Sequence, residues 1–425
     1  MRGPGGRRLA VSLAGALLAA AAWCQHKLPE LAGRAVFEDS GRPPPWLAIP
    51  ATTRRDFDLG HDVFNRQWVP GGTDVANGGL GPLFVENSCD GCHDDGARGR
   101  PPASPGQLSN SFVMQLGGPS TAYGHVLNTR AIDGHAAEGR VTLTWSQRTG
   151  RYRDGTQWSL RVPRYAMEDP AQGPLPAQTV LKPRIGPALF GVGLIDAVPQ
   201  SALDAIRQAQ PRSVRGRTAG RFGWQGGAIS LVDQTAIAFA REMGLTSELQ
   251  PDDDCTPAQH GCRAAPRSGG PELSERLFHA VNTFQFLLAA PARATIDAAI
   301  DTAGAGLFER TGCAACHVPQ LPVPRDSGDI RIDPYTDLLL HDLGDGLADR
   351  TVDGRKVTSL WRTPPLWGLA HALHAGPVAL LHDGRAASIE EAILWHEGQA
   401  GAARRRFMAL DAKARRQLLD WIATL

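Results

Sequence analysis

Residues 312–317 read Gly-Cys-Ala-Ala-Cys-His, and residues 89–93 repeat the pattern as Cys-Asp-Gly-Cys-His. Two thiols separated by two residues can bond to the two vinyl groups of one haem, and the imidazole that follows can bind its iron. A thiol–disulfide pair or half of a zinc site is the alternative, but neither needs a histidine directly after the second cysteine. The motifs therefore predict two covalently attached c-type haems. The thioether cysteines would be Cys89, Cys92, Cys313 and Cys316, and the iron ligands His93 and His317.

The composition limits both the partners and the fold. The chain has 425 residues, enough for two or three domains that each bury a core. Its 44 basic and 43 acidic residues give a formal net charge of +1, so neither a nucleic acid partner nor general attraction to an anionic membrane is expected. The 48 glycines and 32 prolines indicate many loops. We expect a mainly α protein with loop-rich insertions, because a haem replaces much of the side-chain core of a small domain.

The N-terminus has the features of a secretory signal. Three arginines precede an apolar run over residues 9–22, which is short for a membrane span and ends in small residues. We therefore expect residues 1–24 to be a signal peptide and the protein to be periplasmic, where bacteria attach c-type haem. A lipid anchor at Cys24 is less favoured because the large Trp23 precedes it. Membrane contact is expected only through an uncleaved or lipidated N-terminus.

The remaining pair of cysteines, Cys255 and Cys262, lies in a polar loop. In an oxidising compartment such a pair most simply closes a small structural disulfide. A metal site built with His260 is the alternative, but no further thiols are left to complete it.

A β-hairpin is predicted between the two haem motifs. Residues 141–145 and 158–162 alternate apolar and polar side chains on either side of a turn. We expect this hairpin to be a structural flap beside the first haem. His125 and His135, just before it, could reach that haem but are more typical of loop histidines.

Polar side chains that could serve the first haem lie in two segments. Residues 231–243 have the apolar spacing of a helix, which places Gln234 and Glu242 near one face. Two polar groups beside a haem would suit the handling of a bound oxidant. Arg98 and Arg100 follow the first motif, and their guanidinium groups could pair with haem propionates. A solvated basic turn is the alternative for either arginine.

Similar segments follow the two haem motifs in the same order. Residues 187–191 read Pro-Ala-Leu-Phe-Gly, and residues 364–368 read Pro-Pro-Leu-Trp-Gly. Further on, residues 224–228 correspond to residues 382–386. The repeat predicts two cytochrome c-like haem domains related by internal duplication. Their expected bounds are 25–290, with the first haem, and 291–425, with the second.

Four further segments carry a family resemblance. They read Arg-Gly-Arg-Pro-Pro at 98–102, Leu-Leu-Leu-His-Asp-Leu-Gly at 338–344, Trp-Arg-Thr-Pro-Pro-Leu-Trp-Gly-Leu at 361–369 and Leu-His-Asp-Gly-Arg-Ala at 381–386. With the haem motifs, this set resembles the di-haem oxidoreductase family, related to the bacterial di-haem cytochrome c peroxidases, over nearly all of the mature chain. The resemblance implies a peroxidatic N-terminal haem with an open distal face and a six-coordinate C-terminal haem that supplies electrons.

The resemblance also assigns roles to single residues. Trp224 matches the tryptophan between the haems, Gln234 the distal glutamine and Glu242 the catalytic glutamate, the last after a two-residue deletion. His396 stands where the peroxidases place the methionine that binds the second iron. A histidine there should lower the haem potential, since axial ligands tune haem over roughly 0.8 V. The histidines that match buried residues near this haem without binding its iron are His341 and His382.

Together these patterns predict a periplasmic di-haem oxidoreductase. It would reduce hydrogen peroxide, or another small oxidant, at the first haem with electrons relayed through a bis-histidine second haem. The sequence does not identify the periplasmic electron donor, and calcium between the domains, as in related peroxidases, stays open. Two other interpretations remain: an electron-transfer cytochrome with two six-coordinate haems, and a di-haem oxygenase or oxidase of a protein side chain.

Overall fold

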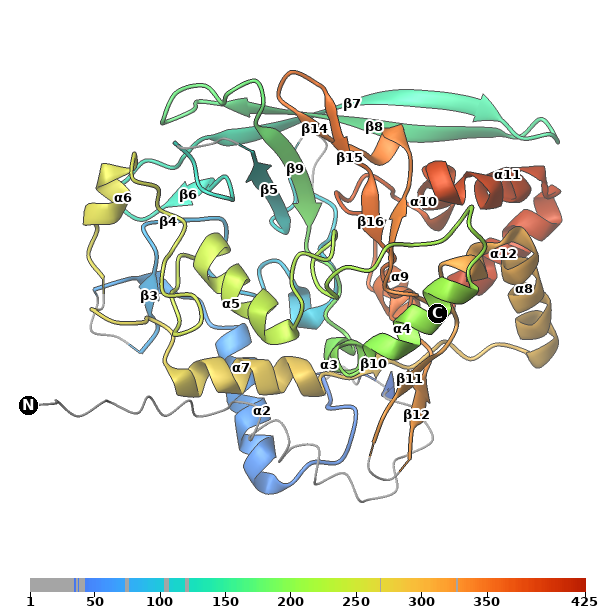
Figure 1. Ribbon diagram of the computed structural model, residues 1–425, viewed down its shortest axis with the longest axis horizontal. Coiled ribbons are helices and arrows are strands. Elements are labelled where there is room, and N and C mark those ends of the chain that lie inside the picture. The colour runs from blue at the N-terminus through green and yellow to red at the C-terminus, as the bar shows by residue number, and fades with distance from the viewer. Residues whose placement is uncertain are drawn as a thin grey trace, which may run out of the picture.

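The computed structural model describes residues 34–425 apart from 36, 38–42, 73–75, 103–106, 119–121, 268 and 326–327. It is 31% helix and 20% strand, and the strands form several small sheets (Figure 1). The expectation of a mainly α protein built from two cytochrome c-like domains is therefore wrong. The boundary between residues 290 and 291 stays a prediction, and the expected signal peptide with Cys24 lies outside the described residues. Among the helices described, none is both long and apolar enough to cross a membrane.

Two helices, α2 (Ala51–Phe64) and α7 (Glu275–Leu287), pack side by side and form one side of the core (Figure 1). Their apolar faces meet through aromatic rings. The ring centroids of Phe57 and Phe64 lie 5.2 and 5.3 Å from that of Phe284. Aromatic pairs at this separation stabilise the contact beyond the area that they bury.

Helix α5 (Leu231–Glu242) packs against α7 and against the short helix α3 (Val192–Asp196). The predicted helix over residues 231–243 is thus confirmed. It begins after Ser230, whose hydroxyl oxygen accepts a 3.1 Å hydrogen bond from the backbone N–H of Asp233. This cap satisfies one of the free N–H groups of the first turn.

One antiparallel sheet joins segments from both halves of the sequence. Its strand order is β15 (Lys356–Thr358), β14 (Asp349–Thr351), β9 (Val180–Ile185) and β5 (Phe112–Gly117). Arg184 of β9 donates two hydrogen bonds, of 2.8 and 2.7 Å, to the carboxylate of Asp349 in β14. Both side chains are buried, so this ion pair fixes β14 against β9.

The predicted hairpin is present and longer than expected. Strands β7 (Arg140–Arg151) and β8 (Gln157–Glu168) pair over twelve residues each and run along one edge of the molecule (Figure 1). Near its turn, the Tyr152 hydroxyl donates to the Glu390 carboxylate at 2.7 Å, and the Arg415 guanidinium lies 3.7 Å from the Tyr152 ring centroid. The turn end of the hairpin therefore contacts the C-terminal helices, and a flap beside the first haem stays a prediction.

The C-terminal part of the chain contains a helix pair that leads into the second haem motif. Helix α8 (Ala298–Thr311) packs on α12 (Ala412–Ile422), and the ring centroids of Phe308 and Trp421 lie 5.1 Å apart. Helix α8 ends at Gly312, whose φ of +87° is the left-handed conformation that glycine adopts without strain. The chain thus turns sharply into Cys313.

The other elements are short and connect these parts. The helices are α4 (Gln200–Ala209), α6 (His260–Ala264), α9 (Leu369–His374), α10 (Ile389–Leu394) and α11 (Gly401–Ala409). The 3₁₀ turns are Asp94–Gly96, Cys313–Ala315, Asp345–Leu347 and Gly398–Ala400. The paired strands are β1 (Arg34–Ala35) with β10 (Ala290–Pro291), β2 (Val69–Pro70) with β3 (Gly78–Leu80), β4 (Leu83–Phe84) with β6 (Arg130–Ala131), β11 (Leu321–Val323) with β12 (Ile330–Ile332), and β13 (Leu340–Asp342) with β16 (Leu360–Arg362).

The sequence repeat has a local structural counterpart. In each copy an isolated β-bridge closes a loop, a glycine with positive φ lies within the loop, and a serine caps the helix that follows. In the first copy these are the Phe222–Ala228 bridge, Gly226 and Ser230; in the second they are the Leu380–Ala386 bridge, Gly384 and Ser388. The repeat is therefore visible in the folding of short segments.

Candidate functional site

Both Cys-x-x-Cys-His motifs fold into the same turn. The backbone N–H of His93 donates to the carbonyl oxygen of Cys89 at 2.9 Å, and that of His317 donates to Cys313 at 2.9 Å. Such a turn places the two cysteines and the histidine on one face. Gly186 leaves room for the first motif, because a Cβ there would lie only 3.0 Å from Cε1 of His93. Each motif can therefore meet one flat ligand with two thiols and an imidazole.

The three histidines predicted to bind iron share one contact, which joins Nδ1 to a backbone carbonyl oxygen. The pairs are His93 with Pro187 at 2.8 Å, His317 with Tyr335 at 3.0 Å and His396 with Ala392 at 2.6 Å. A carbonyl can only accept, so Nδ1 carries the proton and Nε2 keeps a lone pair for a metal. Burial lowers the pKa of His93 and of His317 to about 4, and it also lowers the pKa of His396. All three imidazoles are therefore neutral at neutral pH, the form that binds metals.

The second motif faces a cavity of about 360 Å³, within the usual size range of ligand pockets. Cys313, Cys316, His317 and His396 all line it. Burial lowers the pKa of His317, and the positive charge that the nearby His396 imidazole can carry lowers it further. His396 lies just beyond the end of α10 and reaches the same space as His317 from another part of the chain. The two imidazoles thus line one cavity, each from a different part of the chain.

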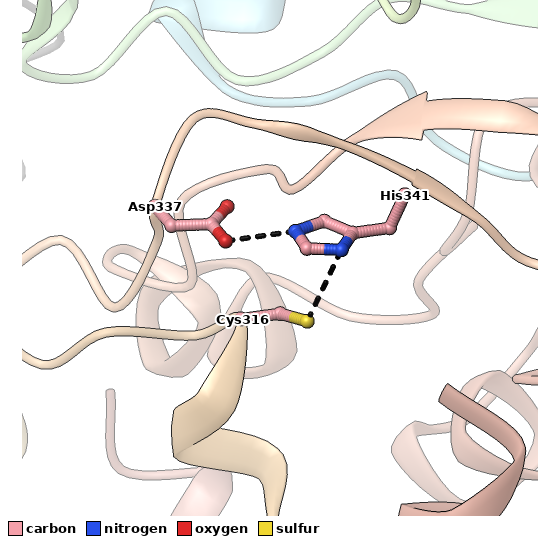
Figure 2. Close-up of side chains that lie close together, drawn as sticks. All are labelled: Cys316, Asp337 and His341. Atoms are coloured by element: carbon pink, nitrogen blue, oxygen red, sulfur yellow. Dashed lines mark hydrogen bonds and ion pairs between the residues drawn. The ribbon is translucent and has the colours of Figure 1, made fainter. Parts of the chain in front are cut away.

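Two other histidines line this cavity but are engaged differently. Figure 2 shows His341 between Cys316 and Asp337: Nε2 lies 2.8 Å from Oδ2 of Asp337, and Nδ1 lies 3.6 Å from Sγ of Cys316. The ring of His382 stacks on Trp361, with centroids 3.8 Å apart and planes 13° apart. Both rings are buried. Neither makes the contact between Nδ1 and a backbone carbonyl that the other three share in the described structure.

The cluster in Figure 2 also resembles an incomplete metal site. Cys316, Asp337 and His341 each place one potential ligand atom within 4.8 Å of the others. A structural zinc ion takes four protein ligands, and the described residues supply three here. Oδ2 of Asp337 also accepts a 2.7 Å hydrogen bond from Gln210. Because Cys316 belongs to the second haem motif, the cluster fits covalent haem attachment better than zinc.

Two arginines of the cavity wall, the half-buried Arg98 and the buried Arg362, fit the carboxylates of a haem. Arg98 and Arg362 both line the cavity, and burial lowers the pKa of each to about 10. Nε of Arg98 is buried and has no hydrogen-bond partner among the described residues, whereas Nε of Arg362 donates to Gly223 at 3.1 Å. Burying a cation is costly unless a partner compensates it, which propionates would do. Arg100, by contrast, is exposed and pairs with Asp94.

Trp224 connects the first motif with this cavity. Its indole Nε1 donates a 2.8 Å hydrogen bond to the carbonyl oxygen of Ile185, two residues before the carbonyl that holds His93. The indole ring lines the cavity, and the Arg98 guanidinium lies 5.8 Å from its centroid. Trp224 therefore contacts both the segment that orients the first imidazole and the space in front of the second motif.

Helix α5 brings Glu242 to the first motif. The Glu242 carbonyl accepts a 2.7 Å hydrogen bond from the backbone of Val85, and burial raises the pKa of the Glu242 carboxyl to about 7. Burial raises the pKa of the Cys89 thiol to about 12, and the charge of the Glu242 carboxylate acts in the same direction. Gln234 lies two turns earlier, half-buried, beside the loop that carries Trp224. Helix α5 thus places Glu242 at the first motif and Gln234 beside the loop that carries Trp224.

The remaining sequence candidates lie in or near the disulfide loop. Cys255 and Cys262 form a disulfide, with their Cα atoms 5.9 Å apart. His260 is exposed at the start of α6. Nδ1 of the exposed His125 lies 2.7 Å from the carboxylate of Asp254. The thiols of this loop are thus bonded to each other, and His125 is engaged by a carboxylate.

Sequence reasoning missed two residues of the cavity region. Arg362 stands within the quoted segment 361–369, but its burial depends on the β13–β16 pair, which has no local signal. Asp337 stands four residues before His341, and this spacing is the local feature of the sequence that could have indicated their contact.

Comparison with known proteins gives one family match. A family described as "Di-haem oxidoreductase, putative peroxidase" matches residues 213–425, just over half of the chain. A solved structure of hydrazine synthase from Kuenenia stuttgartiensis is similar over 94% of this chain and 99% of that one, with 13% identity and a TM-score of 0.40. At that score the likeness supports no conclusion about this chain. No curated protein matches it.

Proposed function

The chain belongs to the di-haem oxidoreductase family, and we propose that it is a periplasmic enzyme that reduces hydrogen peroxide at the first of two covalently bound haems, with electrons relayed through the second. The observation that carries the proposal is the contact between Nδ1 and a backbone carbonyl, shared by His93, His317 and His396. His93 belongs to the first motif, whereas His317 and His396 both line the cavity at the second. With that division, His93 would hold the first haem and leave room there for a small oxidant, while His317 and His396 would together hold the second.

The haems would supply iron that exchanges single electrons and binds a small oxidant where an axial position is open. Cys89 and Cys92 would tether the first haem, and Cys313 and Cys316 the second. The guanidinium groups of Arg98 and Arg362 would bind propionates at the cavity of the second haem. Nε of Arg98 is buried and has no hydrogen-bond partner in the described part of the chain, which supports the assignment.

Glu242 would move the proton that peroxide reduction requires. Its carboxylate would take the proton from one peroxide oxygen and return it to the other as water leaves, a general acid–base task. A pKa of about 7 suits this role, because both protonation states are then accessible near neutral pH. Gln234 would orient the oxidant by hydrogen bonding; its half-buried position beside the Trp224 loop makes this the weaker of the two assignments.

The location follows from two features. The apolar N-terminal run predicts export, and the bond between Cys255 and Cys262 agrees with an oxidising compartment. The electron donor would be a periplasmic redox protein or small reductant. Calcium between the two parts of the chain is an expectation from the peroxidase relatives.

Electron paramagnetic resonance of the purified ferric protein, before and after peroxide, tests the proposal. We expect one high-spin signal, from the open first haem, and one low-spin signal from the bis-histidine second haem. Peroxide should consume the high-spin signal. Two low-spin signals that do not respond to peroxide, in the oxidised and half-reduced protein, would contradict the enzyme and indicate an electron carrier.

A further inference from the structure

The cavity at the second motif opens to solvent between a loop and a helix. The residues of its wall are buried or half-buried, except for the exposed Pro211, Ser213 and Arg406. Two of these lie in the loop 211–217, which follows α4, and the third lies on α11. Nε2 of Gln399 ties the loop to the turn before α11, because it donates a 2.9 Å hydrogen bond to the carbonyl oxygen of Arg215. Residues 211–217 and α11 together form the rim of the cavity.

The rim is strongly basic. Its charged side chains are all arginines, at positions Arg212, Arg215, Arg217, Arg404, Arg405 and Arg406. In the sequence, residues 205–232 and 398–410 contain no aspartate or glutamate. The chain as a whole has a formal net charge of only +1, so the positive charge of the rim is a local feature.

Several of these charges are free to meet a partner. Nη1 of Arg404 lies 3.9 Å from Oε1 of Glu397, a long contact for an ion pair. Arg212 and Arg405 are exposed, and neither forms an ion pair in the part of the chain that the structure describes. Guanidinium groups of this kind bind carboxylates with two parallel hydrogen bonds. The rim therefore offers binding positions for acidic side chains.

The exposure of the rim favours a large partner over a small anion. A single exposed ion pair contributes little to binding, because water hydrates both groups well. A partner must therefore meet several arginines at once, which a protein with grouped surface carboxylates can do. Complementary charge also speeds the encounter of two proteins.

The rim lies against the second motif. Nη1 of Arg406 donates a 2.8 Å hydrogen bond to the carbonyl oxygen of Thr311, two residues before Cys313. Arg406 also lines the cavity together with Cys313. A protein bound on the rim would therefore bring its own redox centre close to the space in front of the motif.

We infer that the rim is the docking surface of an acidic redox protein, which delivers electrons at the second motif. The inference rests on the proposed function, because that function places the haem that receives the electrons in this cavity. At each encounter the partner is oxidised by one electron and the chain is reduced by one. Two encounters supply the two electrons that, with two protons, reduce one hydrogen peroxide to two molecules of water.

The test uses the haem-loaded protein and a plant-type ferredoxin, a small acidic electron donor. The double variant Arg212→Glu with Arg405→Glu reverses two exposed charges of the rim. As the matched control, Arg55→Glu with Arg276→Glu makes the same change in net charge at exposed positions of α2 and α7. Stopped-flow absorbance measures how fast reduced ferredoxin reduces the ferric haem, and interferometry measures the affinity for oxidised ferredoxin.

At low ionic strength the rim variant should bind ferredoxin at least about tenfold more weakly than the wild type, and its haem should be reduced at least about tenfold more slowly. The control variant should stay within about twofold of the wild type for both quantities. Salt at about 0.5 M should remove the difference, because it screens exposed charges.

Equal affinities and rates in the rim variant and the wild type overturn this inference alone. Binding to phosphatidylglycerol vesicles that depends on the rim, without such binding of ferredoxin, also overturns it, because the rim would then face a membrane. Hydroquinone, a small neutral reductant, checks the proposed function separately: all three proteins should reduce peroxide with it at the same rate. A wild type that does not do so overturns the proposed function and, with it, the role of the bound protein as electron donor.

Discussion

The indole Nε1 of Trp224 donates a 2.8 Å hydrogen bond to the carbonyl oxygen of Ile185. Two residues further on, the carbonyl of Pro187 holds Nδ1 of His93 at 2.8 Å. The indole ring itself lines the cavity that also contains His317. One short segment therefore links the ligand of the first predicted iron to an aromatic ring at the site of the second. This arrangement gives a physical basis for electron transfer between the haems through Trp224.

Replacing Trp224 by phenylalanine tests that path. The variant keeps a buried ring but removes the indole N–H, which should lower the free energy of unfolding by about 1 kcal/mol. We expect electron transfer between the haems to slow, measured by rapid mixing of the half-reduced protein with peroxide. Trp145→Phe, on the β7 strand, is the control. An unchanged rate in Trp224→Phe would remove the indole from the path.

His396→Gly tests the second axial ligand. Removing the imidazole should convert the low-spin second haem to a high-spin haem, visible in the absorption and paramagnetic resonance spectra. Added imidazole should restore the low-spin form by occupying the space. His382→Gln, another buried histidine of the same cavity, should keep the wild-type spectrum. A low-spin second haem in His396→Gly would show that another group binds the iron.

Glu242→Gln should abolish peroxide turnover and leave the haem content unchanged, because the amide cannot take the proton. In the wild type the carboxyl must be deprotonated to act as a base. With its pKa at about 7, turnover should rise with pH through that value. Steady-state assays from pH 5 to pH 9 measure the profile. Substantial turnover in Glu242→Gln would exclude the carboxylate from the proton transfer.

The same carboxyl should make stability depend on pH. Burial raises the pKa of Glu242 from 4.5 to about 7, so between these values the folded chain holds a proton that the unfolded chain has released. Folding is therefore favoured below this window, and the free energy of unfolding should fall as the pH rises through it, by about 1.4 kcal/mol for each pH unit. Urea titrations at several pH values should show a smaller fall in Glu242→Gln, and an equal fall would contradict the assignment.

Elements formed by neighbouring residues could be predicted from the sequence, whereas contacts between distant segments could not. Helix α5 and the β7–β8 hairpin were predicted, because the residues that form each of them are neighbours in sequence. The sheet of β5, β9, β14 and β15 was not, since its strands are short and β14 pairs with β9 from a distant part of the chain. For the same reason Arg98 was expected at the first haem. Arg98 also lines the cavity at the second motif, and its place at the first haem stays a prediction.

The two arginines after the first motif form a matched pair for a redox experiment. Arg98 is half-buried in the cavity wall, whereas Arg100 is exposed and paired with Asp94. Removing a buried positive charge beside a haem favours the ferric state. Arg98→Ala should therefore lower the reduction potential of the second haem, by roughly tens of millivolts at the effective dielectric of proteins. Arg100→Ala should leave it unchanged in spectroelectrochemical titrations. Equal potentials in both variants would place the propionates elsewhere.

The buried ion pair of Arg184 and Asp349 should dominate the stability of the central sheet. Arg184→Met leaves the Asp349 carboxylate with the 2.9 Å hydrogen bond from Gln225 but without its cation. Breaking one side of a buried pair costs about 3–5 kcal/mol, while the same substitution at the exposed Arg140 should leave stability nearly unchanged. Urea denaturation measures both.

Combining Arg184→Met with Asp349→Leu should recover part of the loss, because no charge is then left unpaired. A loss below about 1 kcal/mol in Arg184→Met would mean that water or a proton compensates Asp349.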